Sequence, residues 1–152
     1  MTRIASMSEE LLQKHIVKLL TAYARPDIEW HHVPNGEERH PATARKLKDM
    51  GVQSGVGDIM LLIDSRSHAL ELKTEIGTQS GAQSEWQERH ERAGGIYHIA
   101  FGLDQALGIL QGINAFRPGV TIHNALGKGA RGEGISTRSS PQSFTSEPRA
   151  PA

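Results

Sequence analysis

The sequence of 152 residues contains no cysteine. This absence excludes disulfides, thiolate zinc sites, iron–sulfur clusters and thiol nucleophiles. The chain also has no formal net charge, because lysine and arginine together number 17 and aspartate and glutamate together number 17. A local basic stripe can still lie on a neutral protein. No segment approaches the roughly 18 apolar residues of a membrane span, and none has the pattern of a signal peptide. These absences predict a cytoplasmic protein without membrane contact.

The composition divides the chain into a folded part and a tail. Hydrophobic residues make up 37% of the chain and charged residues 22%, which is ordinary for a globular domain with a packed core. From position 127 onward, Gly, Ser, Pro, Arg and Thr dominate and large apolar residues almost disappear. We therefore expect one domain over residues 8–126 and a disordered tail over residues 127–152.

Apolar periodicity and turn residues predict eight helices and strands. A helix begins after Ser8, because Leu12, Ile16 and Leu20 recur at helical spacing. Five consecutive large apolar residues at 59–63 predict a strand that is buried on both faces. The other expected elements are strands at residues 28–33, 68–73 and 96–101 and helices at residues 41–50, 83–93 and 103–110. This order predicts the α/β class, with a central mixed sheet flanked by helices.

Two charged side chains occupy one face of the strand at residues 68–73. Side chains alternate along a strand, so Glu71 and Lys73 share one face while Leu70 and Leu72 share the other. The leucines require burial, which gives the charged pair a defined direction.

Asp58 lies at the start of the preceding strand and is expected on the same face. A connection over residues 64–67 places Asp58 opposite Lys73 and diagonal to Glu71, with the two carboxylates roughly 5–8 Å apart. A register shift of one residue would destroy this arrangement, whereas a shift of two residues would preserve it.

Two carboxylates at this separation repel each other unless a positive charge lies between them. An oxygen-ligated Mg²⁺ ion fits such a gap, and a nearby lysine completes a site able to hydrolyse a phosphodiester bond. The alternative is structural: Asp58 would cap a loop, and Glu71 and Lys73 would form a surface pair worth under about 1 kcal/mol.

Several segments match, in order, the pattern of one nuclease family. They are Asp58 after a Gly-rich loop, Glu71-Leu-Lys73, and the flanking motifs His32-Val-Pro-Asn-Gly36, Ala44-Arg-Lys-Leu-Lys48, Gly51-Val-Gln-Ser-Gly-Val-Gly-Asp58 and Gln83-Ser-Glu-Trp86 before Ala93-Gly94. On these residues, the chain resembles a stand-alone VRR-NUC domain of the PD-(D/E)xK superfamily over residues 8–110. The resemblance implies a PD-(D/E)xK restriction-endonuclease-like fold and metal-dependent hydrolysis of DNA.

The resemblance also implies a set of metal ligands for Mg²⁺ or Mn²⁺. Asp58 and Glu71 would bind the ion through their carboxylates, and Leu72 through its backbone carbonyl. The family adds a glutamate from its first helix. Here Glu9 fits this role better than Glu10, because Glu9 shares the apolar face of the helix.

Two further residues receive roles from the same resemblance. Lys73 would orient or polarise the attacking water and neutralise charge in the transition state. Gln83 matches the family's glutamine and would either support a ligand or contact phosphate. The family usually has proline before the aspartate, whereas this chain has Gly57, so its loop is less rigid.

Other functional interpretations are possible for the Gly-rich loop, three of the histidines and two aromatic residues. The Gly-rich loop at 51–57 is followed by neither a Walker lysine nor a dinucleotide fingerprint, so we expect no nucleotide cofactor. Structural zinc is a minor alternative for three histidines that lack helical ligand spacing, namely His31, His32 and His40. Trp86 and Tyr97 are most simply core residues, and stacking on a base is the alternative.

Branched or duplex DNA is the expected partner. A group of cations precedes Asp58 and is interpreted as a clamp for the DNA backbone, or alternatively as a solvated helix face; it consists of Arg39, Arg45, Lys46 and Lys48. The resemblance implies a homodimer that acts on four-way (Holliday) junctions, and the minimal architecture suggests a bacterial or phage origin. The rival functions are a non-cleaving nucleic-acid-binding module of a repair complex and a restriction-like or RNA-processing nuclease.

Overall fold

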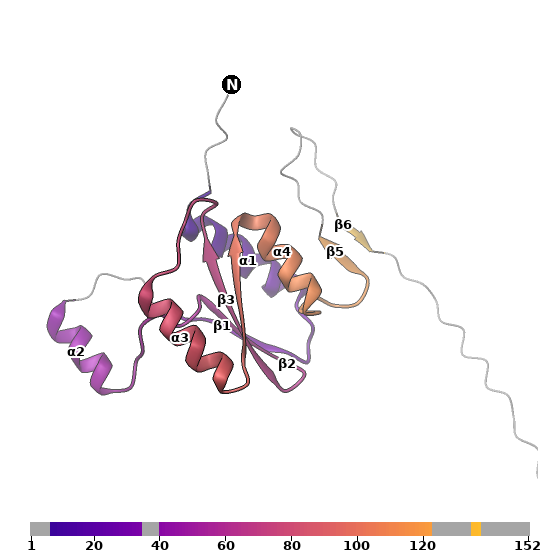
Figure 1. The fold of residues 1–152 in the computed structure, drawn as a ribbon. Helices are drawn as coiled ribbons and strands as arrows, with labels where there is room; N and C mark the ends of the chain where they lie inside the picture. The colour runs from indigo at the N-terminus through magenta and orange to yellow at the C-terminus, as the bar shows by residue number, and fades with distance from the viewer. Residues whose placement is uncertain (1–6, 35–39, 123–134, 138–152) are drawn as a thin grey trace, which may run out of the picture.

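A four-stranded sheet forms the centre of the molecule in the computed structural model (Figure 1). The structure describes residues 7–34, 40–122 and 135–137. The helices are α1 (Glu9–Tyr23), α2 (Pro41–Asp49), α3 (Gly81–Arg92) and α4 (Gly102–Gly112). The strands are β1 (Glu29–His32), β2 (Ile59–Ile63), β3 (Arg66–Lys73), β4 (Ile96–Phe101), β5 (Val120–Ile122) and β6 (Ile135–Thr137).

The sheet is mixed, with strand order β1-β2-β3-β4. Strand β2 is antiparallel to both neighbours, whereas β4 runs parallel to β3. Helix α3 connects the two parallel strands, as a crossover between parallel strands requires. The predicted α/β class, with a central mixed sheet flanked by helices, is confirmed. The sequence did not predict β5 and β6, which form a separate antiparallel pair.

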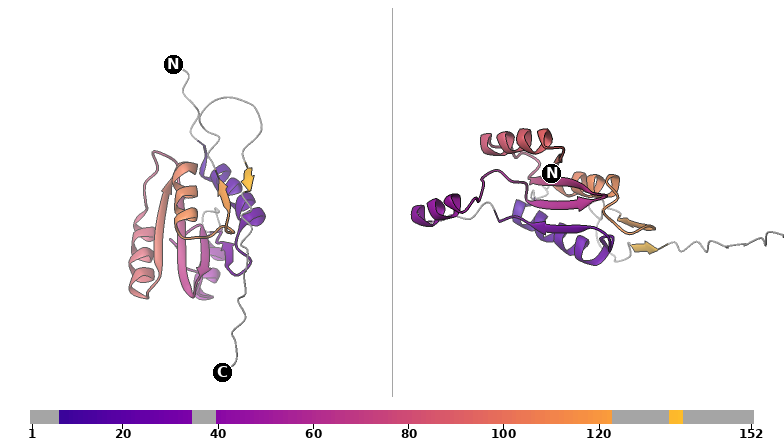
Figure 2. Two further views of the ribbon diagram at one scale, coloured as in Figure 1. Left: turned by 90° about the vertical axis from the view of Figure 1, so that its right-hand side faces the viewer. Right: turned by 90° about the horizontal axis from the view of Figure 1, so that it is seen from below.

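The apolar core lies between one face of the sheet and the helices α1 and α4 (Figure 2). Leu12, Ile16 and Leu20 of α1 are buried, as their helical spacing predicts. They share the core with Ile59, Leu61, Leu70 and Leu72 of the sheet and with Ala106, Leu107 and Leu110 of α4. Since side chains alternate along β3, Glu71 points to the opposite face, where α3 packs against β4.

The connection between β2 and β3 is shorter than predicted. The register pairs Ile63 with Arg66, so the loop contains Asp64 and Ser65 alone. Both residues have positive φ, 49° and 63°, which is the conformation of a two-residue type I′ turn. The expected connection over residues 64–67 is therefore wrong, and the strand register differs by two residues. A shift of two residues keeps every side chain on its expected face.

Strand β2 is buried on only one face, contrary to the prediction from its five apolar residues. Leu62 is 51% exposed, while Ile59, Leu61 and Ile63 are buried. Helix α3 packs against the edge strand β4 and reaches β3 through Gln83. It does not extend over β2. The second face of β2 therefore has no helix over it in the described part of the chain.

Helix α2 lies at one side of the molecule, away from the sheet (Figures 1 and 2). None of its residues is buried, so the helix depends on its own backbone and caps. Arg39, of the expected cation group, lies outside the described residues, as does the expected tail apart from β6. In the part that the structure describes, no helix has the length and apolar character to span a membrane.

The Gly-rich loop before β2 packs against the first turn of α3. Gly55 has a φ of +80°, and a Cβ atom there would lie 2.1 Å from the carbonyl oxygen of Ala82. Glycine alone permits both this backbone conformation and this close approach. The contact couples the loop that leads to Asp58 with the helix that carries Gln83.

Replacing Gly55 with alanine should destabilise the protein and displace the start of α3. Gly51→Ala is the matched control, because Gly51 also has positive φ (+92°) but no atom within 4 Å of its Cβ position. The control should cost about 1–2 kcal/mol from the backbone alone, and Gly55→Ala clearly more. Urea unfolding of both variants measures the difference. Equal losses would show that the contact with Ala82 does not matter.

Candidate active site

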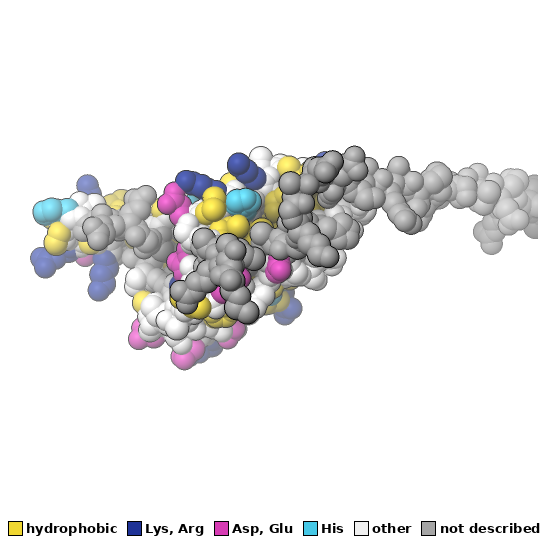
Figure 3. Space-filling view, turned by 90° about the horizontal axis from the view of Figure 1, so that it is seen from above, with side chains coloured by type: hydrophobic (Ala, Val, Ile, Leu, Met, Phe, Trp, Pro, Cys, Tyr) yellow, Lys and Arg dark blue, Asp and Glu magenta, His cyan; other side chains and the backbone are white. Residues whose placement is uncertain are grey.

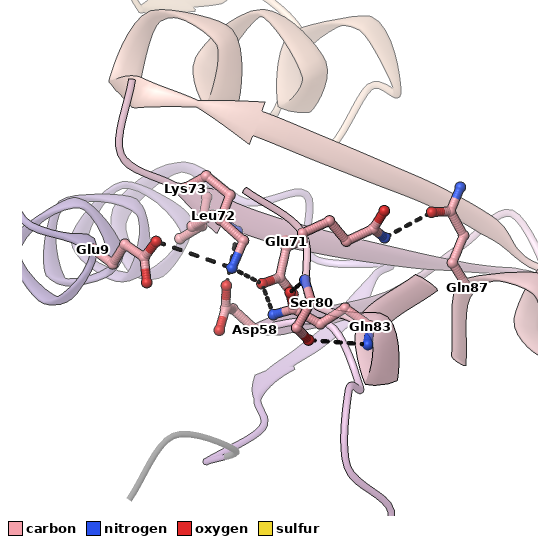
Figure 4. A network of polar contacts seen from close by, with 9 residues as sticks. Glu9, Asp58, Glu71, Leu72, Lys73, Ser80, Gln83 and Gln87 are labelled. Atoms are coloured by element: carbon pink, nitrogen blue, oxygen red, sulfur yellow. Dashed lines mark hydrogen bonds and ion pairs between the residues drawn. The ribbon is translucent and has the colours of Figure 1, made fainter. Parts of the chain in front are cut away.

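Charged side chains from the end of β3 and from Asp58, the residue before β2, lie close together (Figure 4). The register pairs Ile59 with Leu70, so the next position places Asp58 opposite Glu71. This corrects the predicted pairing of Asp58 with Lys73, but the three side chains still share one region. Oδ2 of Asp58 accepts a hydrogen bond of 2.7 Å from the backbone N–H of Leu72, which fixes the aspartate on β3.

Glu71 is the most buried charged residue of the site, with 1% of its surface exposed. Its Oε1 atom accepts a hydrogen bond from Nε2 of Gln83 and lies 2.9 Å from Nζ of Lys73. Its Oε2 atom is buried without a hydrogen-bond partner. One oxygen of the carboxylate is thus held by two donors, while the other remains an unused acceptor.

Gln83 ties Glu71 to the beginning of α3. Its Oε1 atom accepts from the backbone N–H of Ser80 at 2.8 Å, and its own backbone N–H donates to Oγ of Ser80. This reciprocal pair is a capping box. Both polar atoms of the Gln83 side chain are therefore engaged, which favours support of Glu71 over contact with phosphate.

Glu9 reaches the site from the first turn of α1. Its Oε1 atom lies 4.0 Å from Nζ of Lys73. The neighbouring Glu10 instead pairs with Lys14 on the exposed side of the helix. The structure thus places Glu9 in the site, next to Lys73.

The carbonyl group of Leu72 is directed toward Asp58. The N–H of Leu72 donates to Asp58, and the N–H and C=O of one strand residue leave the strand on the same side. The carbonyl oxygen therefore points away from β4 and toward the segment that precedes β2, where the resemblance implies a metal ion.

Burial and charge change the proton affinities of these groups. Burial, followed by the charge of Asp58, raises the pKa of Glu71 to about 7. Burial is also the main cause that raises the pKa of Asp58, against the hydrogen bond from Leu72. For Lys73, burial lowers the pKa, but the hydrogen bond and charge of Glu71 raise it more, and the net shift is upward. Lys73 is therefore a cation beside two poorly solvated carboxylates.

The donor set fits a hard divalent cation. Oε2 of Glu71 is a buried acceptor without a partner, and a positive charge near Asp58 and Glu71 would favour their ionised forms. Mg²⁺ prefers oxygen ligands and commonly retains several waters. No group of three or more His, Cys, Asp or Glu side chains that could hold a metal occurs among the described residues. The protein's share of the ligands would be Asp58, Glu71 and the Leu72 carbonyl, and a ligand role for Glu9, which lies beside Lys73, stays a prediction.

Sequence reasoning missed the position of His32. Its Nδ1–H donates to the backbone oxygen of Asp58 at 2.7 Å, whereas the sequence suggested only a minor zinc alternative for this residue. His40 instead caps α2, where its Nδ1 accepts from the N–H of Ala42. The one signal for His32 in the sequence was its place in the matched motif before the site.

The comparisons with known proteins identify the fold. No family model and no curated protein matches the chain. A solved structure described as a VRR_NUC domain protein matches with a TM-score of 0.60 and 23% sequence identity, covering 70% of this chain and 88% of that chain. The chain has a VRR-NUC-like fold. The resemblance inferred from the sequence motifs is thereby confirmed at the level of the fold.

Neutralising Glu71 should stabilise the metal-free protein at alkaline pH. The folded state binds a proton at Glu71 more strongly than the unfolded state does, because the pKa is raised from 4.5 to about 7. Wild-type stability should therefore gain, relative to Glu71→Gln, as pH falls from 8 to 5. The variant should equal or exceed wild type at pH 8, by on the order of 2 kcal/mol at most, and lose this advantage at pH 5.

Thermal unfolding in EDTA across this pH range measures the effect. Glu88→Gln, at an exposed position of α3, is the control and should follow wild type at every pH. A Glu71→Gln variant that is less stable than wild type at pH 8 would contradict the expectation.

Proposed function

We propose that this chain is a Mg²⁺- or Mn²⁺-dependent endonuclease that hydrolyses phosphodiester bonds in DNA. The observation that carries the proposal is the meeting of Asp58, Glu71 and Lys73 at the ends of two strands in a VRR-NUC-like fold. A surface ion pair would be exposed, whereas Glu71 and Lys73 are buried. Burial without full hydrogen bonding costs stability, and a catalytic role explains why the site accepts that cost.

Each residue of the site would have a distinct task. Asp58, Glu71 and the carbonyl of Leu72 would hold the divalent cation, which supplies positive charge to the phosphoryl oxygens when bound. Nζ of Lys73 would orient the attacking water and neutralise the charge that develops on the phosphate. Gln83 would keep the Glu71 carboxylate in place, and Glu9 would hold Lys73 from its other side.

The cations of α2 support binding of a DNA backbone near this site. Arg45, Lys46 and Lys48 are exposed on a helix without buried residues, and dark blue side chains gather over α2 in Figure 3. A groove of about 660 Å³ lies between α2, the Gly-rich loop and α3, and Lys48 and Arg89 line it. The same loop continues into Asp58, so a strand held in the groove would lie close to the carboxylates.

Branched DNA, above all the four-way junction, is the substrate we propose. Such a junction presents two symmetry-related strands, which two copies of the chain could cut together. Purified protein is to be incubated with labelled linear, flapped and four-way-junction DNA and with RNA, in Mg²⁺, Mn²⁺ or EDTA. Preferred cleavage of RNA or linear DNA would favour the other nuclease class, and binding without any cleavage would favour a non-cleaving module.

Cleavage should require a divalent cation together with Asp58 and Glu71. Mg²⁺ and Mn²⁺ should support it, and excess EDTA should abolish it, because the proposed ligands are all hard oxygens. Asp58→Asn and Glu71→Gln should abolish cutting while the protein stays folded. Gel analysis of product formation, with circular dichroism as the test of folding, decides the outcome. Cutting that persists in EDTA, or in either folded variant, would refute the proposed chemistry.

Lys73 and the α2 cations should differ in the step that they affect. Lys73→Met should reduce the cleavage rate by a factor on the order of 10² to 10³ with DNA affinity nearly unchanged. Neutralising Arg45, Lys46 and Lys48 together should weaken binding of all substrates alike. It should also flatten the dependence of log affinity on log salt by roughly one unit per lost contact.

The control for the α2 variant removes three other exposed cations, Lys14, Lys18 and Arg92, on α1 and α3. Fluorescence anisotropy over a range of salt concentrations measures affinity and slope. The same loss in both triple variants would reflect net charge alone and would refute a clamp on α2.

A further inference from the structure

Three buried side-chain atoms among the described residues have no hydrogen-bond partner: one is Nε2 of His90 on α3, and the other two belong to strand residues on one face of the sheet. These two are Oε2 of Glu71 and the hydroxyl of Tyr97. Glu71 is 1% exposed and Tyr97 is 9% exposed, so bulk water is a poor substitute partner for either group. A buried hydroxyl and a buried carboxylate oxygen each lose stability when they remain unpaired.

The strand register makes these two residues diagonal neighbours on one face of the sheet. Glu71 of β3 pairs with Ile99 of the parallel strand β4, and Tyr97 precedes Ile99 by two residues, so it points to the same face. The hydroxyl interacts with two polar side chains, those of Glu71 and Gln79. The ring of Tyr97 packs against Trp86 of α3 at a centroid distance of 6.0 Å, which restricts the orientation of the ring.

The carboxylate of Glu71 can accept a hydrogen bond from one more donor. A carboxylate has about four lone-pair sites, and Lys73 and Gln83 occupy two of them at Oε1. Oε2 could accept from Tyr97 and still offer one lone pair to a cation. The hydroxyl is a donor at neutral pH, because burial and then the charge of Glu71 raise the pKa of Tyr97.

We propose that Tyr97 is a positioning residue for the candidate active site, whose hydroxyl donates a hydrogen bond to Oε2 of Glu71. Together with Lys73 and Gln83 on Oε1, this bond fixes the plane of the carboxylate and aims its last lone pair at the cation. The proposal rests on the proposed metal-dependent function. It assigns to Tyr97 a task that a core residue would not have.

The hydrogen bond can be observed without any activity. The chain has two tyrosines, so Tyr23→Phe leaves Tyr97 as its only tyrosine. Ultraviolet resonance Raman spectra of this variant, free of metal, report whether the Tyr97 hydroxyl is a strong donor. A strong-donor signature that weakens on adding Glu71→Gln supports the proposal, and a signature that does not respond to Glu71→Gln overturns it.

The positioning role is tested by metal binding to the full chain. Tyr97→Phe keeps the ring against Trp86 and removes the hydroxyl alone. Calorimetric titration with Ca²⁺ should give an affinity about tenfold or more weaker than wild type, as for other groups that orient a metal ligand. Tyr23→Phe is the matched control and should bind like wild type. Thermal unfolding should show that both variants are folded.

The outcomes separate this proposal from the proposed function. Unchanged Ca²⁺ affinity in a folded Tyr97→Phe variant overturns the role of Tyr97 and leaves the metal site standing. A wild-type protein that binds neither Ca²⁺ nor Mn²⁺ overturns the metal-dependent function, and the positioning role with it. In that case the Raman spectra still decide whether Tyr97 contacts Glu71.

Discussion

The burial of one carboxylate, that of Glu71, is the constraint on which the site depends. An ionised carboxylate away from water is costly unless it is paired and hydrogen-bonded. Lys73 and Gln83 meet this requirement at one oxygen, and they come from different elements. The hydrogen bond from Gln83 to Glu71 thus connects the beginning of α3 to the end of β3. Lys73 extends the network to Glu9 on α1.

The same carboxylate is left only partly satisfied by hydrogen bonds. Oε2 of Glu71 has no hydrogen-bond partner, and the charge of Asp58 adds to burial in raising the pKa of Glu71. A divalent cation would relieve both costs at once. Helix α2 contributes nothing to the core, so its exposed basic surface is free to meet a polyanion.

Much of the fold follows from local pattern, and the departures have identifiable causes. Leu12, Ile16 and Leu20 are buried on α1 as their spacing predicts. The β2–β3 connection differs because the positive φ of Asp64 and Ser65 closes a turn that composition alone does not indicate. Leu62 is exposed because the helix that would cover it lies over other strands, a matter of packing that an apolar run does not encode.

The sequence by itself determined the face on which Asp58, Glu71 and Lys73 meet. Strand alternation has a period of two, so the two-residue error in register left that face unchanged. Only the tertiary structure decided what surrounds the carboxylates. The parallel pairing of β4 makes Tyr97 a diagonal neighbour of Glu71, and the packing of α3 brings Gln83 into hydrogen-bond contact with Glu71. These contacts join residues distant in the chain, whose proximity depends on topology and packing rather than on any local pattern.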